Sequence, residues 1–205
     1  MIPTQEIFAA AAVVLVLAAY IPYMFDIVKG KVAPHPFSWL IWAMTATAIF
    51  FLQTSNGSGA GAYGTATVAV CAALIFIFAF RTNKVKVRPL DIISLVLALV
   101  GIVVWIFVQQ PFISIIILLF VEVIGFIPTY LNGWRRPYKD SMTVWAVNGG
   151  RHALGLAAVQ QYNFITVLNP IVWLVLCVSY VSTLAFRRMF FVKNPDRKRL
   201  FRPYN

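Results

Sequence analysis

The feature that most limits the possible folds is a series of apolar stretches, each long enough to cross a lipid bilayer. Residues 7–25, 92–108 and 163–186 contain no charged side chain, and each stretch approaches the ~20 residues that a helix needs to span the hydrocarbon core. The chain is 61% hydrophobic and only 11% charged, which excludes an ordinary water-soluble domain. Four further apolar segments run over 37–52, 60–80, 112–131 and 142–159.

These stretches predict helices rather than strands. In lipid every backbone polar group must be hydrogen-bonded within the protein, so only helices and closed barrels cross a membrane. The stretches do not alternate polar and apolar residues as barrel strands do. The first stretch does not read as a cleavable signal, because no Lys or Arg precedes it and no polar domain follows. We therefore expect an all-α membrane protein with seven transmembrane helices.

The pattern of helices occurs twice, at an offset of 106 residues. A single helix joins the two triplets, so both begin on the same side of the membrane and form parallel repeats. Duplicated segments of this kind build transporter sites near the middle of the bilayer. We expect a first triple-helix bundle at 5–81, a basic loop and linker helix at 82–110, a second triple-helix bundle at 111–188 and a basic cytoplasmic tail at 189–205. The matching positions are Ile21-Pro22 and Ile127-Pro128, Trp39 and Trp145, Cys71 and Cys177, and Ala79-Phe80-Arg81 and Ala185-Phe186-Arg187.

Positive charge is confined to alternate loops. The net charge is +11, yet the N-terminus and the turns near 53–59, 109–111 and 160–162 carry no Lys or Arg. Because cytoplasmic loops collect Lys and Arg, the N-terminus is expected outside and the C-terminus in the cytoplasm. The basic loops then face anionic lipid headgroups, and we expect no nucleic-acid partner. The basic residues are Lys29, Lys31, Arg81, Lys84, Lys86, Arg88, Arg135, Arg136, Lys139 and those of the tail from Arg187 onward.

This 3+1+3 plan resembles the SWEET and PQ-loop (MtN3-saliva) transporter superfamily over residues 5–188. The segments 20–23 and 126–129, Tyr-Ile-Pro-Tyr and Phe-Ile-Pro-Thr, occupy the places of the family's Pro-Gln pair. Tyr23 and Thr129 replace glutamine, as in a bacterial-type branch that lacks the pair. The resemblance implies solute translocation by alternating access. Members of the family carry sugars, amino acids or vitamin precursors, and some relatives are cargo receptors.

Two charged residues lie inside the apolar segments. Glu122 and Arg151 each lie about 16 Å from their helix entry points at 1.5 Å per residue, near the middle of the bilayer. An unpaired charge there costs at least ~2.5 kcal/mol, so we expect them to pair or to face one aqueous cavity. They form either a fixed ion pair that sets helix register or a substrate or coupling site. His152 beside them is a candidate proton acceptor or a satisfied buried histidine.

Aromatic and amide side chains share a helix face with these charges. Trp145, Asn148 and His152 fall at i, i+3 and i+7. Their counterparts in the first triplet include Trp39 and Trp42. Indoles stack on sugars and flat rings, and an amide hydrogen-bonds hydroxyls or carboxamides. We therefore expect Trp42, Trp145, Asn148 and Arg151 to bind substrate. The alternative for Trp39 and Trp145 is an aromatic belt at the membrane interface.

The third helix of each triplet carries another pair of candidates. Tyr63 and Asn169 are equivalent by the repeat. The resemblance implies that an asparagine at this place contacts substrate, and Asn169 matches it. The alternative is a hydrogen bond between helices. Pro22 and Pro128 are expected to kink their helices and to act as hinges, because a proline inside a helix removes a backbone hydrogen bond.

The sequence contains no enzyme motif. It lacks a phosphate-binding loop, an HExxH pair and a nucleophile elbow, and it has only six acidic residues. We expect no enzyme activity, no cofactor and no metal, and we expect Cys71 and Cys177 to be packing residues. The predicted function is transport of a small polar solute (a sugar, a nucleoside or vitamin precursor, or an amino acid) in a bacterial inner or plasma membrane. The alternative is a non-transporting receptor or scaffold subunit, and a homo-oligomer is compatible with either.

Overall fold

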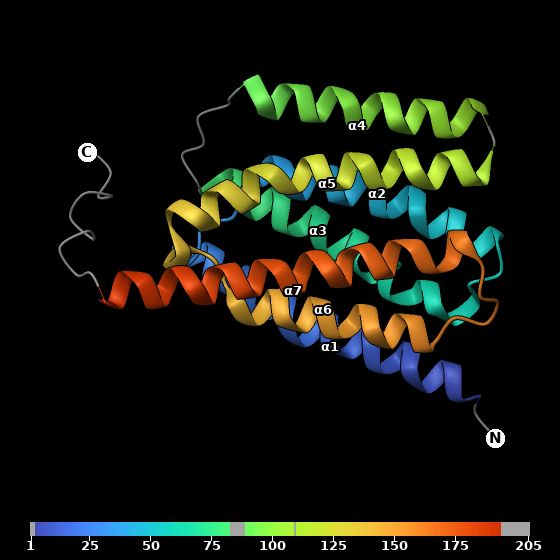
Figure 1. The fold of residues 1–205 in the computed structure, drawn as a ribbon, viewed down its shortest axis with the longest axis horizontal. Helices are drawn as coiled ribbons and strands as arrows, with labels where there is room; N and C mark the ends of the chain where they lie inside the picture. Colours follow the sequence, from blue (N-terminus) through green and yellow to red (C-terminus); the bar gives the residue numbers. More distant parts are fainter. Residues whose placement is uncertain (1–2, 83–88, 109, 194–205) are drawn as a thin grey trace.

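The computed structural model describes residues 3–82, 89–108 and 110–193. Within these ranges the chain forms seven α-helices and two short 3-10 turns, with no strand (Figure 1). The predicted all-α class with seven helices is confirmed. The helices are α1 Thr4–Val28, α2 Pro36–Ser55, α3 Tyr63–Thr82, α4 Pro89–Val108, α5 Pro111–Arg135, α6 Met142–Ala157 and α7 Phe164–Lys193, and the turns are Gly59–Ala62 and Pro137–Lys139.

Five of these segments are long and apolar enough to cross a membrane. They are Thr4–Val28, Pro36–Ser55, Gly59–Thr82, Pro111–Arg135 and Phe164–Phe190. Helix α6 has 16 residues, a length of about 24 Å, and α4 offers a shorter described apolar stretch, Leu95–Phe107. These lengths and compositions are compatible with an integral membrane protein. Helix α4 has 20 residues, enough to cross the hydrocarbon core, whereas α6 is shorter.

The distribution of side chains is the reverse of that in a water-soluble protein. Large apolar side chains lie on the outside: Val14 is 63% exposed, Phe120 is 61% exposed and Val175 is 62% exposed. Glu122 and Arg151 are buried instead. An apolar exterior of this extent is stable when hydrocarbon surrounds it.

Helices α1–α3 and α5–α7 pack around a common interior. Helix α3 packs against both α1 and α2, and α7 packs against both α5 and α6. Between these two groups, α1 packs on α6 and α2 packs on α5. Helix α4 lies on the outer side of α5 and also touches α2 (Figure 1). The interior of the protein is thus formed by six helices, and α4 is peripheral.

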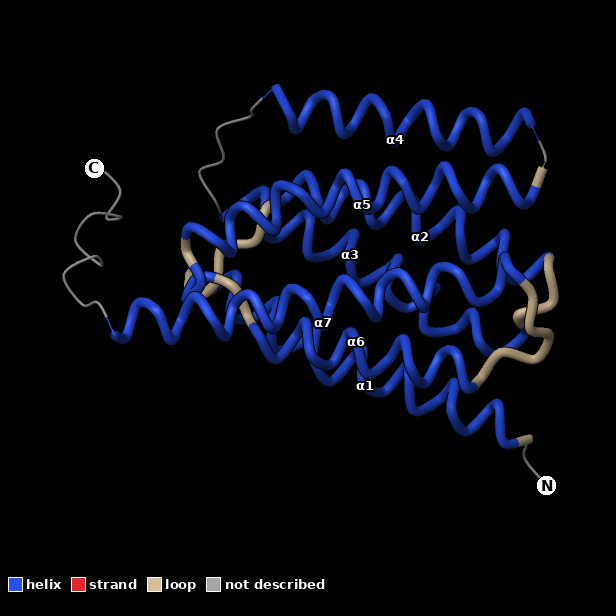
Figure 2. The backbone as a smooth tube through the Cα atoms, viewed as in Figure 1, coloured by secondary structure: helices blue, strands red, loops and turns tan. Residues whose placement is uncertain are grey.

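The loops gather at the two ends of the bundle (Figure 2). At one end, which we call the polar-loop end, the α2–α3 loop joins the α6–α7 loop. The backbone N–H of Gln160 donates to the carbonyl of Ser58 at 3.3 Å, and that of Gln161 donates to the carbonyl of Gly57 at 3.2 Å. Gly57 has a φ of +84°, and a Cβ there would overlap the Gln161 side chain, so glycine permits this close approach. The contacts close the polar-loop end.

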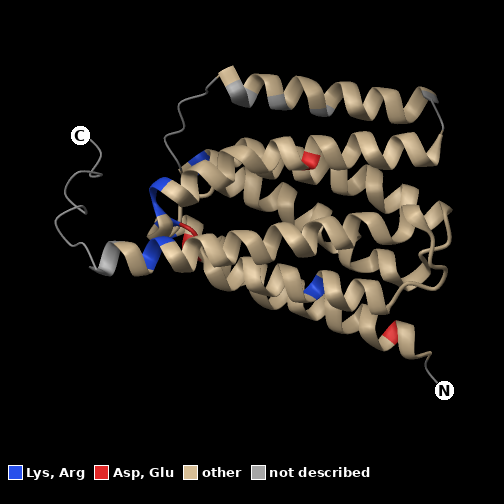
Figure 3. Cartoon of the chain, in the orientation of Figure 1, with Lys and Arg blue, Asp and Glu red and all other residues tan. Residues whose placement is uncertain are grey.

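The opposite end is the basic end. The described Lys and Arg residues gather there, apart from Arg151 in the middle of α6 (Figure 3). The basic loops of the α1–α2 and α5–α6 connections and the end of α7 meet at this end. The predicted basic residues at 84, 86 and 88, and the tail from 194 onward, lie outside the described residues.

A close contact between α5 and α7 provides a test of the packing. A Cβ on Gly133 would overlap the phenol of Tyr180, and that ring is held by two hydrogen bonds from its hydroxyl. Overpacking of this kind costs about 1–3 kcal/mol, more than the ~1 kcal/mol by which alanine favours a helix over glycine. We expect Gly133→Ala to lower the melting temperature of the purified protein in detergent.

Gly150→Ala is the matched control for that variant. Gly150 is an exposed glycine of α6, and the nearest atom to its added Cβ is a Leu15 methyl at 4.0 Å. Alanine is the better helix former, so this variant should melt at the same or a higher temperature. Equal melting temperatures for both variants would contradict the described contact between α5 and α7.

Candidate functional site

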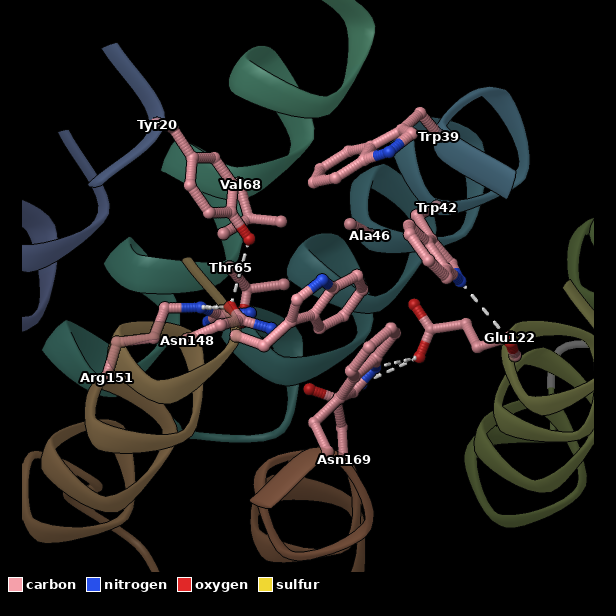
Figure 4. A pocket seen from close by; sticks show the side chains of 12 residues that line it. Tyr20, Trp39, Trp42, Ala46, Thr65, Val68, Glu122, Asn148, Arg151 and Asn169 are labelled. Atoms are coloured by element: carbon pink, nitrogen blue, oxygen red, sulfur yellow. Dashed lines mark hydrogen bonds between the residues drawn. The ribbon is translucent and has the colours of Figure 1, made fainter. Parts of the chain in front are cut away.

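A small polar cavity lies in the interior, between the two groups of helices. Its volume is about 20 Å³, room for about one water molecule. Side chains from all six interior helices surround it, and the described side chains of α4 contribute none (Figure 4). The lining residues are Tyr20, Trp39, Trp42, Ala46, Thr65, Val68, Glu122, Trp145, Asn148, Arg151, Asn169 and Trp173. The cavity is thus occluded in this conformation.

Glu122 of α5 lies on one side of the cavity and is only 2% exposed. Its Oε2 accepts hydrogen bonds from Trp173 Nε1 at 2.6 Å and from Asn169 Nδ2 at 3.1 Å. Its Oε1 accepts one from Thr45 Oγ1 at 2.9 Å. Asn169 and Trp173 reach the carboxylate together because they are four residues apart on α7, on one helix face. All three donors are neutral, so they orient the carboxylate without neutralising it.

Arg151 of α6 lies on the other side and is 6% exposed. Its Nε donates to Asn148 Oδ1 at 2.7 Å, and its Nη2 lies 2.7 Å from His152 Nε2. The Tyr20 hydroxyl also donates to Asn148 Oδ1, at 3.1 Å. His152 in turn stacks on Trp173, with ring centroids 5.9 Å apart and parallel planes. The guanidinium is therefore held by an amide and an imidazole, not by an acid.

Glu122 and Arg151 face the same cavity from opposite sides (Figure 4). Within the described residues they form no ion pair; the pair found there is Lys31 with Asp26, at 3.4 Å on the surface. Both charges line this one cavity, and the roles predicted for them stay predictions. A fixed ion pair between them is not formed.

Four indoles, those of Trp39, Trp42, Trp145 and Trp173, line the cavity together with the two charges. Trp42 makes edge contacts with Trp39, Trp145 and Trp173, at centroid distances of 5.2, 5.7 and 5.3 Å. Trp39 and Trp145 are each 2% exposed. The alternative that they belong to an interfacial belt is therefore wrong, because α2 and α6 turn these faces inward.

Tyr63 does not line the cavity. It is 54% exposed at the first position of α3, although its repeat counterpart Asn169 is buried and bonded to Glu122. The 3-10 turn at Gly59–Ala62 precedes α3 and sets its start, and Thr65 occupies the cavity side instead. The prediction that Tyr63 contacts substrate at this site is thus corrected.

Several residues of the cavity were not predicted from sequence. Trp173 was detectable, because it lies one helical turn after Asn169. Thr45, which does not line the cavity but donates to Glu122, was also detectable, since it is the repeat counterpart of Arg151. Thr65 carries no distinguishing signal, because a single threonine in an apolar helix often bonds its own backbone. Tyr20 carries none either, because a tyrosine in an apolar helix is common.

A second buried polar group lies at the basic end, around Asp140. Its Oδ2 accepts from the Tyr180 hydroxyl at 2.7 Å, and its Oδ1 accepts from Trp145 Nε1 at 3.2 Å and from the Tyr23 hydroxyl at 3.3 Å. We call these four residues the Asp140 cluster. It ties α1 to α6 and α7 and closes the basic end of the interior. Sequence analysis assigned Asp140 no role.

The two helix prolines adjoin the Asp140 cluster. Pro22 lies inside α1 and Pro128 inside α5. Tyr23, which follows Pro22, donates to Asp140, and the carbonyl of Thr129, which follows Pro128, accepts from the Tyr180 hydroxyl at 3.2 Å. The residues that follow the two helix prolines therefore both contact this cluster.

The described residues contain no group of three or more His, Cys, Asp or Glu side chains that could hold a metal. Cys71 and Cys177 are buried free thiols. Comparison with known proteins finds no matching family model, no matching curated protein and no matching solved structure. The function is therefore argued from the geometry of the cavity and its two closed ends.

Asp140 gives a prediction about pH. Burial raises its pKa above the ordinary value of 3.8, against the opposing hydrogen bonds from Tyr180 and the Ser141 N–H. The folded state then binds the proton more tightly than the unfolded state, so this contribution to stability is present at low pH and is lost as pH rises through the raised pKa. The melting temperature in detergent should fall over that range.

The Asp140→Asn variant should lack this component of the pH dependence. The amide keeps the size of the side chain and cannot ionise. Glu6→Gln, at an exposed position of α1, is the control and should follow the wild-type curve. Wild-type and Asp140→Asn curves that run parallel from pH 4 to neutrality would show that the carboxylate does not titrate as described.

Proposed function

We propose that this protein is a membrane transporter that moves a small polar solute by alternating access between two triple-helix bundles, α1–α3 and α5–α7. The observation that carries the proposal is the cavity between the bundles, which holds two buried opposite charges and is closed at both ends. Ionisable residues in the membrane interior are costly and are typical of substrate or ion pathways. The packing of apolar helices does not by itself require buried ionisable side chains.

The packing order supports two parallel repeats of the kind found in SWEET and PQ-loop transporters. In each bundle the third helix packs between the first and second: α3 between α1 and α2, and α7 between α5 and α6. The offset of 106 residues relates α1 to α5 and α2 to α6. It therefore relates the α1–α6 contact between the bundles to the α2–α5 contact. These relations are expected of a two-fold axis along the membrane normal. Helix α4 is then the linker.

The proposed location is a bacterial inner or plasma membrane, with the N-terminus outside. The described Lys and Arg side chains of the loops share one end (Figure 3), and cytoplasmic loops are enriched in these residues. The basic end therefore faces the cytoplasm, close to anionic headgroups, and the polar-loop end faces outward.

The two closed ends are the proposed gates. Opening toward the cytoplasm requires Tyr23 of the first bundle to leave Asp140 of the second. Opening outward requires the α2–α3 loop to leave the backbone of Gln160 and Gln161. Pro22 and Pro128 lie next to the inner gate and are the proposed hinges, because a helix without one backbone hydrogen bond bends more easily there.

Within the cavity, Trp42, Trp145, Asn148, Arg151 and Asn169 are proposed to bind the solute. Glu122 and His152 supply counter-charge or coupling.

A second candidate function is a non-transporting receptor or scaffold subunit, which is favoured by the size of the cavity, since 20 Å³ holds about one water molecule. If the protein is a transporter, the two bundles must separate before a solute enters the cavity.

Reconstitution into liposomes distinguishes the two functions. A transporter should exchange a labelled solute across the bilayer, and Arg151→Ala should reduce this exchange at least about tenfold, because a charge-assisted contact contributes roughly 1.5–3 kcal/mol. Gly150→Ala, on the lipid-facing side of the same helix, is the control and should retain exchange. A partner protein that co-purifies in fixed ratio, with no solute exchange, would favour the receptor.

The inner gate gives a further prediction. Tyr23→Phe removes the hydroxyl that joins the first bundle to Asp140, and a net hydrogen bond contributes about 1 kcal/mol. The population open to the cytoplasm should therefore rise about fivefold. The measurement is labelling of Thr65→Cys, a cavity position, by an impermeant thiol reagent from the basic side, with Cys71 and Cys177 replaced by alanine.

Tyr162→Phe is the control for the gate. Tyr162 lies at the polar-loop end, and its hydroxyl donates to the Leu156 carbonyl within the same bundle at 2.7 Å. Its loss should leave labelling from the basic side unchanged. Equal labelling of Tyr23→Phe and the parent protein would show that the Asp140 cluster is not the gate.

A further inference from the structure

We propose that the solute is a zwitterion, with an anionic group that binds Arg151 and a cationic group that binds Glu122. This inference rests on the transport function proposed above and names the substrate class of the same cavity. It is carried by the placement of two opposite charges on opposite sides of one buried cavity, where neither charge has an ionic partner among the described residues.

The burial of both charges makes the missing partners significant. Glu122 is 2% exposed and Arg151 is 6% exposed. A buried charge is costly unless it is paired. The neighbours of both groups are neutral side chains, which hydrogen-bond the charges but add no opposite charge. A solute with both signs of charge supplies the two missing partners at once.

The Arg151 side suits a carboxylate. The guanidinium uses Nε on Asn148 and Nη2 toward His152, which leaves other N–H groups of its planar fork for a ligand. The oxygen of Asn148 already accepts from both Tyr20 and Arg151, so the amide holds the guanidinium in place and does not compete for an anion. Planar two-point contacts with carboxylates are the characteristic use of arginine.

The Glu122 side suits an ammonium group. Oε1 accepts only the Thr45 hydroxyl bond, while Oε2 accepts two N–H groups, so Oε1 retains room for another donor. Trp42 and Trp173 border the carboxylate: Trp42 Nε1 donates to the Glu122 carbonyl at 3.3 Å and Trp173 Nε1 donates to Oε2. The first of these bonds goes to the backbone carbonyl and the second to the carboxylate, so one indole N–H helps to fix the position of the side chain without using Oε1.

The need of each buried charge for a partner of opposite sign disfavours other solutes. A neutral sugar leaves both charges without partners. A cation leaves Arg151 unpaired, and an anion leaves Glu122 unpaired. Unpaired buried charge is a strong basis for rejecting a ligand, so the cavity should discriminate by charge pattern more than by shape.

The test is a panel of labelled solutes in liposomes that contain the purified full chain. The zwitterions are L-alanine, L-phenylalanine and glycine betaine. The matched single-charge probes are the N-acetyl derivatives (anionic) and the amides (cationic) of the two amino acids, and the neutral probes are glucose and uridine. We expect exchange of at least one zwitterion, with each single-charge or neutral probe about tenfold slower or more.

Two charge variants separate a role in recognition from a role in folding. Glu122→Gln keeps hydrogen-bonding oxygen and removes the charge that holds the ammonium, so the preference should shift about tenfold toward the N-acetyl derivative. Arg151→Gln should shift it by a similar factor toward the amide. Opposite shifts in two variants cannot arise from a general loss of folded protein. Glu6→Gln, at the exposed start of α1, should leave the preference unchanged.

The outcomes distinguish failure of this inference from failure of the transport function. Exchange of glucose, uridine or a single-charge probe as fast as the zwitterions would overturn the zwitterion and retain transport. No exchange of any probe, but a zwitterion-specific rise in melting temperature that both charge variants abolish, would retain the site and overturn transport. Neither exchange nor a rise in melting temperature with any zwitterion would overturn both.

Discussion

The structure depends on one constraint, which is that the hydrocarbon core of a bilayer offers no hydrogen-bonding partner to a polar group. Every polar side chain in the spanning region must therefore find its partner inside the protein. The two interior charges follow this rule: Glu122 is bonded by three neutral donors and Arg151 by Asn148 and His152, while the outer surface is apolar. The polar interior is what holds α1–α3 and α5–α7 to a common centre.

The hydrogen bonds around the two charges orient them but do not neutralise them. This distinguishes the cavity from a structural ion pair, in which the two charged groups meet directly and set helix register. Here the two groups do not form an ion pair among the described residues, and both line the cavity together with four indoles. The absence of an ionic partner for either charge supports both the proposed transport function and the proposed zwitterionic solute. A ligand that carries both signs of charge would supply the two missing partners.

The two ends of the interior are closed by different chemistry. The polar-loop end is closed by backbone hydrogen bonds at glycine positions, whereas the basic end is closed by side chains around a buried carboxylate. In the proposed mechanism these two closures open in alternation. The residues after the two helix prolines, Tyr23 and Thr129, both contact the Asp140 cluster, which couples the proposed hinges to the inner gate.

The sequence by itself determined the helical membrane class, the placement of basic loops at one end and the two buried charges, because hydropathy, loop charge and isolated ionisable residues are properties of the linear chain. Tertiary structure alone decided which side chains meet. It placed Tyr63 outside although its repeat partner Asn169 binds Glu122, it buried Trp39 and Trp145 between helices, and it made Asp140 the centre of a cluster. The reason is that helix phase and neighbouring helices set the direction of each side chain, and both are decided by packing in three dimensions, so equivalent positions of the repeat need not have equivalent surroundings.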